Sequence, residues 1–418
     1  MSSYSSFERK IARILRSNQT LKAILKNIYI SIMRLGSLNV KRSETDKKYE
    51  SVHSSEESFF GYYDKNPSNG KGLVIFHTSE FNSSKSPKLA KYIKINLQEE
   101  NSKKIIWSKK TKAFNWQQGS RLQWVTDDKF IYNDFDKNRN IYISKLVSSK
   151  DFKVTIFDLP VQDAYYENYF LSLNYRRLET LRSDYGYHCM PKLTKLELKD
   201  YSSDGIWKMD ISSQCKNLLY SLSEIIKFEF KEEFPNATHK VNHIQISPDG
   251  ERFIFLHRYT FSGKRYDRLF LANSHSKKLE LLAESSLISH YCWLDNTSLA
   301  VYQNNKGNIE SYFHLNIEKK EWTKIMGLEK YGDGHPSGNN MRMVTDSYPD
   351  RSGMQSLFLY KNLENQDSIR LLGRFYHPLN FRRECRCDLH PRYDEKRKLI
   401  YFDSVFSGKR QLYRMDLS

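Results

Sequence analysis

The spacing of apolar residues divides this chain into two parts. Near the N-terminus apolar residues recur at the spacing of amphipathic helices: Phe7, Ile11, Ile14, Leu15, Leu21, Leu25, Ile28 and Ile32. Residues 17–20 interrupt the pattern, so we expect two helices, the second capped by Thr20. From Phe59 onward short Tyr-, Phe-, Ile- and Val-rich runs alternate with polar turns, which predicts strands. We expect a helical extension over residues 1–48 and a β domain over residues 49–418.

A repeating unit organises the β domain and is clearest in residues 241–259, VNHIQISPDGERFIFLHRY. Pro248 and Gly250 suit the second and last positions of a turn, so the unit reads strand, turn, strand. Seven such units follow one another at roughly 50 residues each, the length of a four-stranded propeller blade. The sequence therefore predicts an all-β, seven-bladed β-propeller with a short N-terminal α-helical extension. A two-sheet sandwich is the alternative, but the repeat count argues against it.

Two units depart from the repeat. A polar, Tyr-rich segment at residues 161–187 interrupts the third unit, whose strands we expect at residues 192–198, 205–211 and 217–222. The seventh unit lacks an outer strand, and residues 49–53 can supply it by closing the ring.

The net charge of the chain limits the classes of binding partner that we expect. Lys and Arg number 67 against 49 Asp and Glu, an excess of 18 that favours polyanions. The chain has no RNP-like motif and no zinc-finger cysteine spacing, so we expect no nucleic-acid partner. The partners that we still expect are an acidic polysaccharide or oligosaccharide and an anionic membrane surface. Basic residues lie beside the apolar stripe of residues 7–34 and suit a membrane surface: Lys10, Arg13, Arg16, Lys22 and Lys26. These helices could equally dock on the domain or on another protein.

Cysteine usage and apolar runs bear on location. The five cysteines are scattered and odd in number, which is typical of a reducing compartment. No run approaches the ~18 apolar residues of a membrane span, and the N-terminus lacks the pattern of a signal peptide. We expect a cytoplasmic protein, either free or peripheral at the inner membrane face.

Four histidines occupy the same place in successive units: His243, His290, His335 and His390. His290 precedes Tyr302 by 12 residues and His390 precedes Tyr401 by 11, so the register is shared. Equivalent inner positions of a propeller face one channel, where we expect the four side chains to converge. Earlier units have other polar residues at this place: Tyr63 or Asp64, and Gln118 or Gln123. Converging imidazoles can bind a divalent metal or act as acid and base, or simply hydrogen-bond across the channel.

Arginines accompany these histidines. The tripeptide from His257 to Tyr259 contains Arg258, and Arg265 follows it. Three further arginines flank His390: Arg383, Arg386 and Arg392. The guanidinium fork suits carboxylate or sulfate groups, although any one of these arginines could be an ordinary ion-pair residue.

At these residues the sequence resembles known families. The units NHIQISPDGERFIFLH and LHPRYDEKRKLIYFDSVFSGKRQLYRMDL resemble blades of the Tol-type propeller superfamily, over about residues 59–418. The strand-end His257, the four histidines in register and the closing GKRQLY element resemble more narrowly the oligogalacturonate lyases, which are seven-bladed, metal-dependent polysaccharide lyases. The chain differs from them in reading Arg-Tyr after His257.

That resemblance implies β-elimination from a uronic acid. The base would be His243 or His257, with Arg258 and Arg265 on the carboxylate. His290, His335 and His390, together with Gln123, would hold a divalent metal such as Mn, Ca or Zn. Alternative proton-transfer residues are Tyr63, Tyr187 and Tyr259. The further substrate contacts would be Gln118, Arg383, Arg386 and Arg392. The competing hypothesis is a non-catalytic glycan-binding or capsule or exopolysaccharide assembly protein at the cytoplasmic membrane face, and a protein-interaction scaffold is a third.

Overall fold

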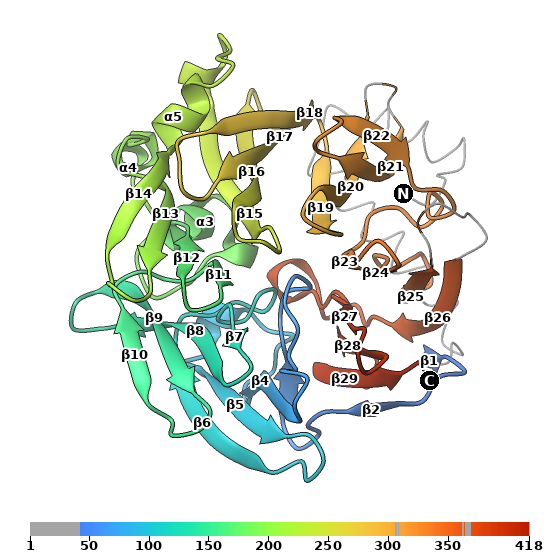
Figure 1. Ribbon diagram of the computed structural model, residues 1–418. Coiled ribbons are helices and arrows are strands. Elements are labelled where there is room, and N and C mark those ends of the chain that lie inside the picture. The colour runs from blue at the N-terminus through green and yellow to red at the C-terminus, as the bar shows by residue number, and fades with distance from the viewer. Residues whose placement is uncertain (1–41, 306, 308, 362, 364–368, 418) are drawn as a thin grey trace.

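The computed structural model describes residues 42–417, except 306, 308, 362 and 364–368. Its strands form seven antiparallel sheets arranged in a ring around a central axis (Figure 1). The protein is thus a seven-bladed β-propeller, as the repeat predicted. The helices predicted within residues 7–34 lie outside the described residues. Within the described ranges, every helix is too short or too polar to span a lipid bilayer.

The blades are numbered in chain order. Blade 1 contains β3 (Glu57–Phe59), β4 (Leu73–Ser79), β5 (Ile93–Glu99) and β6 (Ile105–Thr111). Blade 2 contains β7 (Gln123–Thr126), β8 (Lys129–Asp136), β9 (Ile141–Ser148) and β10 (Val154–Phe157). Blade 3 contains β11 (Asp163–Tyr165), β12 (Tyr169–Ser172), β13 (Gly205–Asp210) and β14 (Lys216–Ser221). Blade 4 contains β15 (Thr238–Ile246), β16 (Arg252–Phe261), β17 (Lys264–Asn273) and β18 (Leu279–Ser285).

The remaining three blades complete the ring. Blade 5 contains β19 (Ile288–Trp293), β20 (Ser298–Asn304), β21 (Glu310–Asn316) and β22 (Glu321–Lys324). Blade 6 contains β23 (Ser337–Gly338), β24 (Arg342–Asp346), β25 (Met354–Lys361) and β26 (Ile369–Tyr376), with β1 (Ser43–Glu44) as a fifth strand that the sequence did not predict. Blade 7 contains β27 (Arg392–Asp394), β28 (Leu399–Ser404), β29 (Gln411–Asp416) and β2 (Tyr49–Ser51).

The turn between β15 and β16 explains why the repeating unit could be recognised in the sequence. Ser247 accepts a hydrogen bond at its side-chain oxygen from the Arg252 backbone N–H at 3.0 Å, which closes the predicted turn. Gly250 has φ of 77°, and a Cβ there would lie 2.3 Å from the Tyr165 ring. Glycine is therefore required both by the backbone angle and by the close packing of this turn on blade 3.

Apolar side chains fill the space between neighbouring blades. The faces of blades 4 and 5, for example, share a buried cluster that includes Ile254, Leu269 and Val301. Buried aspartates also join blades, because their carboxylates accept backbone N–H groups near the inner strand of the next blade. The pairs are Asp163 with Ile246 (2.8 Å), Asp267 with Ile288 (3.0 Å), Asp346 with His390 (3.1 Å) and Asp403 with Phe60 (3.0 Å). These bonds fix the inner strands that surround the channel.

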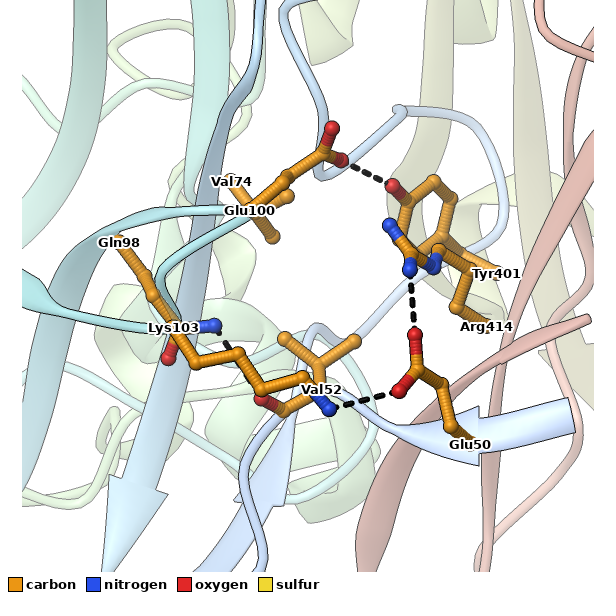
Figure 2. Close-up of a pocket in the computed structure, with 8 residues that line it drawn as sticks. All are labelled: Glu50, Val52, Val74, Gln98, Glu100, Lys103, Tyr401 and Arg414. Carbon is orange, nitrogen blue, oxygen red and sulfur yellow. Dashed lines mark hydrogen bonds and ion pairs between the residues drawn. The ribbon is translucent and has the colours of Figure 1, made fainter.

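The ring closes between β2 and β29, which confirms the prediction that residues 49–53 supply the missing strand. Tyr49 pairs with Met415 and Ser51 with Tyr413. Side chains reinforce the seam around a cavity of about 10 Å³ (Figure 2). Glu50 forms ion pairs with Arg414 and with Lys103, and Glu100 accepts a hydrogen bond from Tyr401.

The strand predicted at residues 192–198 is wrong. The first two strands of blade 3 lie earlier, within the Tyr-rich segment, and residues 173–204 form an insertion between β12 and β13. The insertion holds α3 (Tyr175–Leu181), η3 (Ser183–Tyr185) and α4 (Lys195–Lys199). Helix α4 begins at a capping box in which Thr194 and Glu197 bond each other's backbone N–H groups, so local capping selected a helix there.

Candidate functional site

A short segment after β3 carries two tyrosines into the channel. Gly61 turns the chain at φ of 122°, and a Cβ there would lie 2.7 Å from the Gln118 backbone. Asp403 accepts hydrogen bonds from the backbone N–H groups of Phe60 at 3.0 Å and Gly61 at 3.1 Å. The buried Arg392 donates to the carbonyl oxygen of Tyr62 at 3.0 Å and to Asp403 at 2.9 Å. This scaffold holds the rings of Tyr62 and Tyr63 in place.

The four histidines predicted from the register meet around these tyrosines. Ring centroids are 5.9 Å apart for His243 and His290, 4.2 Å for His290 and His335, and 4.3 Å for His335 and His390. All four are buried. Tyr62 stacks on His243 at 5.4 Å and meets His390 edge-on at 5.1 Å. The histidines therefore form one cluster, which we call the histidine cluster.

Two members of the histidine cluster have an unusual backbone. His243 has φ of 56° and His390 has φ of 44°, values in the left-handed region that residues with a Cβ rarely adopt. Such conformations persist where surrounding contacts enforce them, and they concentrate at functional sites.

Burial and neighbouring charges set the protonation of the histidine cluster. Burial, with added repulsion from Arg258, holds the pKa of His243 well below its usual range, and burial lowers that of His290. Burial and the positive potential of His335 likewise keep the pKa of His390 well below the ordinary value. For His335 burial also acts to lower the pKa, but the carboxylates of Asp346, Asp388 and Asp333 together outweigh it and raise the pKa.

His335, His390 and Asp388 form a group whose ligand atoms all lie within 4.8 Å of one another. The Nδ1 atom of His335 lies 2.8 Å from Asp346, and that of His390 lies 2.6 Å from the Gly61 carbonyl oxygen. The Nε2 atoms of both rings have no hydrogen-bond partner among the described residues. Metal-bound histidines commonly have their second nitrogen held in this way by a carboxylate or carbonyl. The two imidazoles and one carboxylate therefore fit a divalent metal.

The other two predicted ligands have different surroundings. Gln123 donates to the Arg121 carbonyl oxygen at 3.1 Å and accepts from the Ala164 backbone N–H at 3.0 Å, so it bridges blades 2 and 3. His290 lies in the histidine cluster, with its Nδ1 atom 3.0 Å from Asp333. The structure thus places Asp388, rather than Gln123, beside His335 and His390.

A cavity of about 170 Å³ opens beside the histidine cluster. Blades 4 and 5, the insertion in blade 3 and the loop after β24 all contribute to its wall. Six of its lining residues are central to the chemistry: His243, His290, Arg258, Arg265, Arg182 and Tyr348. The wall therefore combines imidazoles and three guanidinium groups with one carboxylate, that of Asp333.

The two arginines predicted from the sequence share one carboxylate. Arg258 Nε lies 3.0 Å from Asp267 Oδ1, and Arg265 Nη2 lies 3.1 Å from Asp267 Oδ2. Arg258 also donates to the Ile288 carbonyl oxygen at 3.0 Å, but its Nη1 atom is buried without a hydrogen-bond partner among the described residues. Arg258 lines the cavity, so its guanidinium has an N–H group left to donate to an anionic oxygen of a ligand.

Several predicted site residues lie elsewhere. His257 stacks on His239 inside blade 4, with 3.0 Å between its Nε2 and His239 Nδ1. Tyr259 stacks on Tyr266 at 4.9 Å. The structure does not bring these two side chains to the cavity wall, because they occupy the opposite face of β16 from Arg258.

The remaining substrate-contact predictions are also placed by the structure. Tyr187 stacks on Tyr175 at 4.2 Å within a buried apolar cluster. Tyr63 donates to the Tyr291 carbonyl oxygen at 2.9 Å, and Gln118 is buried behind Gly61. Arg383 is exposed, whereas Arg386 bonds Asp388 through Nε at 2.8 Å. Arg392 supports the Tyr62 backbone, as described above.

Sequence reasoning missed several residues of the site. Tyr62 and Asp388 could have been found, since each stands one or two positions from a residue that the register selected. Arg182, Tyr185 and Tyr348 had no such signal, because they reach the cavity from the insertion and from a loop outside the repeat.

Comparisons with known proteins agree with this architecture. No family model and no curated protein matches the sequence. The chain is, by fold, a seven-bladed β-propeller. Solved structures similar to it include the β-propeller domain of the Trilobed protease from Pyrococcus furiosus, described as having an open velcro topology (TM-score 0.51, 9% identity, 87% of this chain and 97% of that chain).

Two further solved structures are similar to the chain at a lower level. One is oligogalacturonate lyase from Vibrio parahaemolyticus, with a TM-score of 0.39 and 11% identity over 90% of this chain and 97% of that chain. The other is TolB from Acinetobacter baumannii, with a TM-score of 0.40 and 9% identity over 83% of this chain and 80% of that chain. Similarity at this level concerns the fold.

Proposed function

We propose that this propeller binds an acidic, uronate-type polysaccharide in the cavity beside the histidine cluster and cleaves it by β-elimination. The observation that supports this proposal is that Arg258, Arg265 and His243 line one cavity. Arg258 offers an unpaired Nη1 atom for a carboxylate oxygen. Because its pKa lies well below the usual range, His243 is unprotonated near neutral pH and can accept a proton.

The elimination would use these groups as follows. Arg258 neutralises the C6 carboxylate of the uronate, which lowers the cost of negative charge developing at C5. His243 takes the C5 proton, the electrons of that C–H bond form a C4–C5 double bond, and the C4–O bond breaks. The leaving oxygen takes a proton from a wall hydroxyl. Tyr348 suits this role because burial raises its pKa and keeps the phenol protonated.

A divalent metal would be held by His335, His390 and Asp388. When bound it supplies a Lewis acid that polarises an oxygen of the substrate. Two imidazoles with one carboxylate suit Mn or Zn, whereas Ca prefers a shell made of oxygen atoms.

The test is an assay of the full-length protein with galacturonate, guluronate and glucuronate polymers, each with Mn²⁺ added. We expect the ultraviolet absorbance of an unsaturated product with at least one polymer, and its loss in His243→Asn. The control is His275→Asn, an exposed histidine between β17 and β18 that does not line the cavity and should leave the rate unchanged. If no polymer yields the unsaturated product, the lyase proposal fails.

A second candidate is a non-catalytic acidic-glycan protein for capsule or exopolysaccharide assembly at the cytoplasmic membrane face. The net charge of +18 and the three arginines of the cavity favour an anionic ligand whether or not the protein turns it over. Saturable binding of a uronate oligosaccharide without an unsaturated product would support this candidate against the lyase.

The membrane part of the second candidate concerns residues 7–34, which lie outside the described residues. Each basic residue near an anionic surface contributes about 1 kcal/mol. We expect the full chain to sediment with anionic vesicles in a salt-sensitive way and a variant lacking residues 1–40 to stay in solution. Equal sedimentation of both would contradict the anchor.

A further inference from the structure

A row of charged side chains crosses blade 4 on the cavity side. Lys240 of β15 pairs with Arg258 of β16, and Arg258 pairs with Asp267 of β17. Paired residues of antiparallel strands point to the same face of the sheet. Lys240 therefore stands beside Arg258, on the face that borders the cavity, and it was not among the residues that the sequence singled out.

This row contains more positive than negative charge. Asp267 serves both Arg258 and Arg265. Lys240 Nζ forms no hydrogen bond or ion pair with another residue in the described part of the chain. Arg182 adds a fourth cation from the insertion, and its nearest carboxylate is that of Asp184 at 3.6 Å. Four cations with only the carboxylates of Asp267 and Asp184 among them leave an excess of positive charge, which an added anion would offset.

The pKa of Lys240 also reflects the excess of positive charge around it. Burial, followed by repulsion from Arg258, Arg182 and Arg265, lowers the pKa of Lys240 to about 7, although Asp267 acts in the opposite direction. These are the charged groups that face the ammonium from β16, β17 and the insertion. An anion bound among them would draw a proton onto Lys240.

We infer that Lys240, Arg182, Arg258 and Arg265 form one anion subsite for a ligand that carries two neighbouring negative charges. The inference rests on the proposed function for the first charge, the uronate carboxylate at Arg258. The second charge would lie between Lys240 and Arg182. It can come from a second uronate next to the first in the chain, or from a sulfate ester on the same uronate.

Calorimetric titration of the full-length protein tests this subsite. The probes are galacturonate, digalacturonate and 2-O-sulfated glucuronate, measured at about pH 8 in buffers of different ionisation enthalpy. We expect at least one two-charge probe to bind about tenfold more tightly than galacturonate, with proton uptake. The probe that binds more tightly identifies the source of the second charge.

Substitutions distinguish binding at the proposed subsite from binding of a single carboxylate at Arg258. Lys240→Met should abolish both the tenfold preference and the proton uptake while leaving galacturonate affinity within about twofold. Arg182→Gln should reduce the same preference. Lys71→Met is the control, since Lys71 is exposed and pairs with Asp127 at the surface. The thermal midpoint of each variant shows whether it is folded.

The outcomes distinguish the two proposals. If the saccharides bind but Lys240→Met weakens all of them equally, or none, the subsite is wrong and the proposed function stands. If no saccharide binds, the proposed function fails, and a titration with sulfate against acetate decides the subsite. Sulfate binding that takes up a proton and is lost in Lys240→Met would support it, and equal weak binding of both anions would overturn it.

Discussion

The hydroxyl oxygen of Tyr62 lies 2.8 Å from Nδ1 of His243, and the two rings stack with an interplanar angle of 10°. This contact joins residues 181 positions apart, because the segment after β3 crosses the channel to blade 4. Burial raises the pKa of Tyr62 and lowers that of His243, so the proton stays on the phenol at neutral pH. When the imidazole carries its proton on Nδ1, that N–H donates to the phenol oxygen and the lone pair on Nε2 is available to a substrate.

Replacing Tyr62 by Phe should remove this positioning bond and keep the stacked rings. We expect kcat for uronate elimination to fall about tenfold or more with little change in KM, because proton transfer depends on the orientation of the base. Stability should fall by about 0.5–1.5 kcal/mol, the usual effect of one hydrogen bond. Steady-state kinetics over a range of pH and urea unfolding provide the measurements.

Tyr63→Phe is the matched control. It removes the neighbouring hydroxyl, which bonds the Tyr291 backbone rather than His243. Its stability loss should be similar, but its kcat should stay near the wild-type value. Equal kinetic losses in the two variants would show that Tyr62 acts through packing alone.

Metal binding distinguishes the ligand set of the structure from that of the sequence. Asp388→Asn should lower the affinity for Mn²⁺ or Zn²⁺ by about tenfold or more, since it removes the carboxylate next to two imidazoles. Gln123→Leu should retain the metal, because Gln123 bridges blades 2 and 3. Elemental analysis of purified protein, followed by competition with a chelator, measures both. Metal retained in Asp388→Asn but lost in Gln123→Leu would contradict the assignment.

Arg392 should prove to be a structural residue. Arg392→Met leaves Asp403 buried without its cation and frees the carbonyl oxygens of Gly61 and Tyr62. We expect a loss of about 3–5 kcal/mol in the free energy of unfolding, the typical cost of breaking a buried ion pair. Arg383→Met, at an exposed site, should change stability by less than about 0.5 kcal/mol in the same urea titration.

Lys240 should give the stability a distinctive pH dependence. Its folded pKa of about 7 lies below the ordinary 10.5, so between these values the unfolded chain binds more protons than the folded one. The free energy of unfolding should therefore rise with pH across this window relative to Lys240→Met. Urea unfolding of both proteins at several pH values measures the difference. A constant difference would mean that Lys240 titrates normally.

Ring closure predicts a sharp difference between two truncations. Deleting residues 1–40 removes none of the described strands, whereas deleting residues 1–55 removes β1 and β2 and exposes the edge of β29. We expect the longer deletion to lower the melting temperature of the whole domain and the shorter one to leave it nearly unchanged. Equal melting temperatures would contradict the closing role of β2.

The fold could be predicted because each unit carries its own local signals. The turn at Gly250 and the shared register of the four histidines are visible in single stretches of sequence, and both survive in the structure. The strand at residues 192–198 was predicted wrongly because the third unit is divided by an insertion. The capping box of Thr194 and Glu197 is a local signal for a helix, which the prediction from the repeat did not consider.

The site was predicted only where it follows the repeat. His335 and His390 were expected in the channel and lie there. His257 and Arg258 are adjacent in sequence, but alternation along β16 sends them to opposite faces, and only Arg258 reaches the cavity. Asp388, Lys240 and Arg182 become recognisable once neighbouring strands and the insertion are seen together.

The closure of the ring also sets an order of events during synthesis. Strand β2 pairs with β29, and Ser51 bonds Gln411 across 360 positions of the chain. At translation rates of about 5–20 residues per second, β2 leaves the ribosome on the order of tens of seconds before its partner exists. Throughout that interval β2 has no partner strand to pair with. The nascent propeller is therefore an open ring, and the pairing of β2 with β29 that closes it forms only when β29 has emerged.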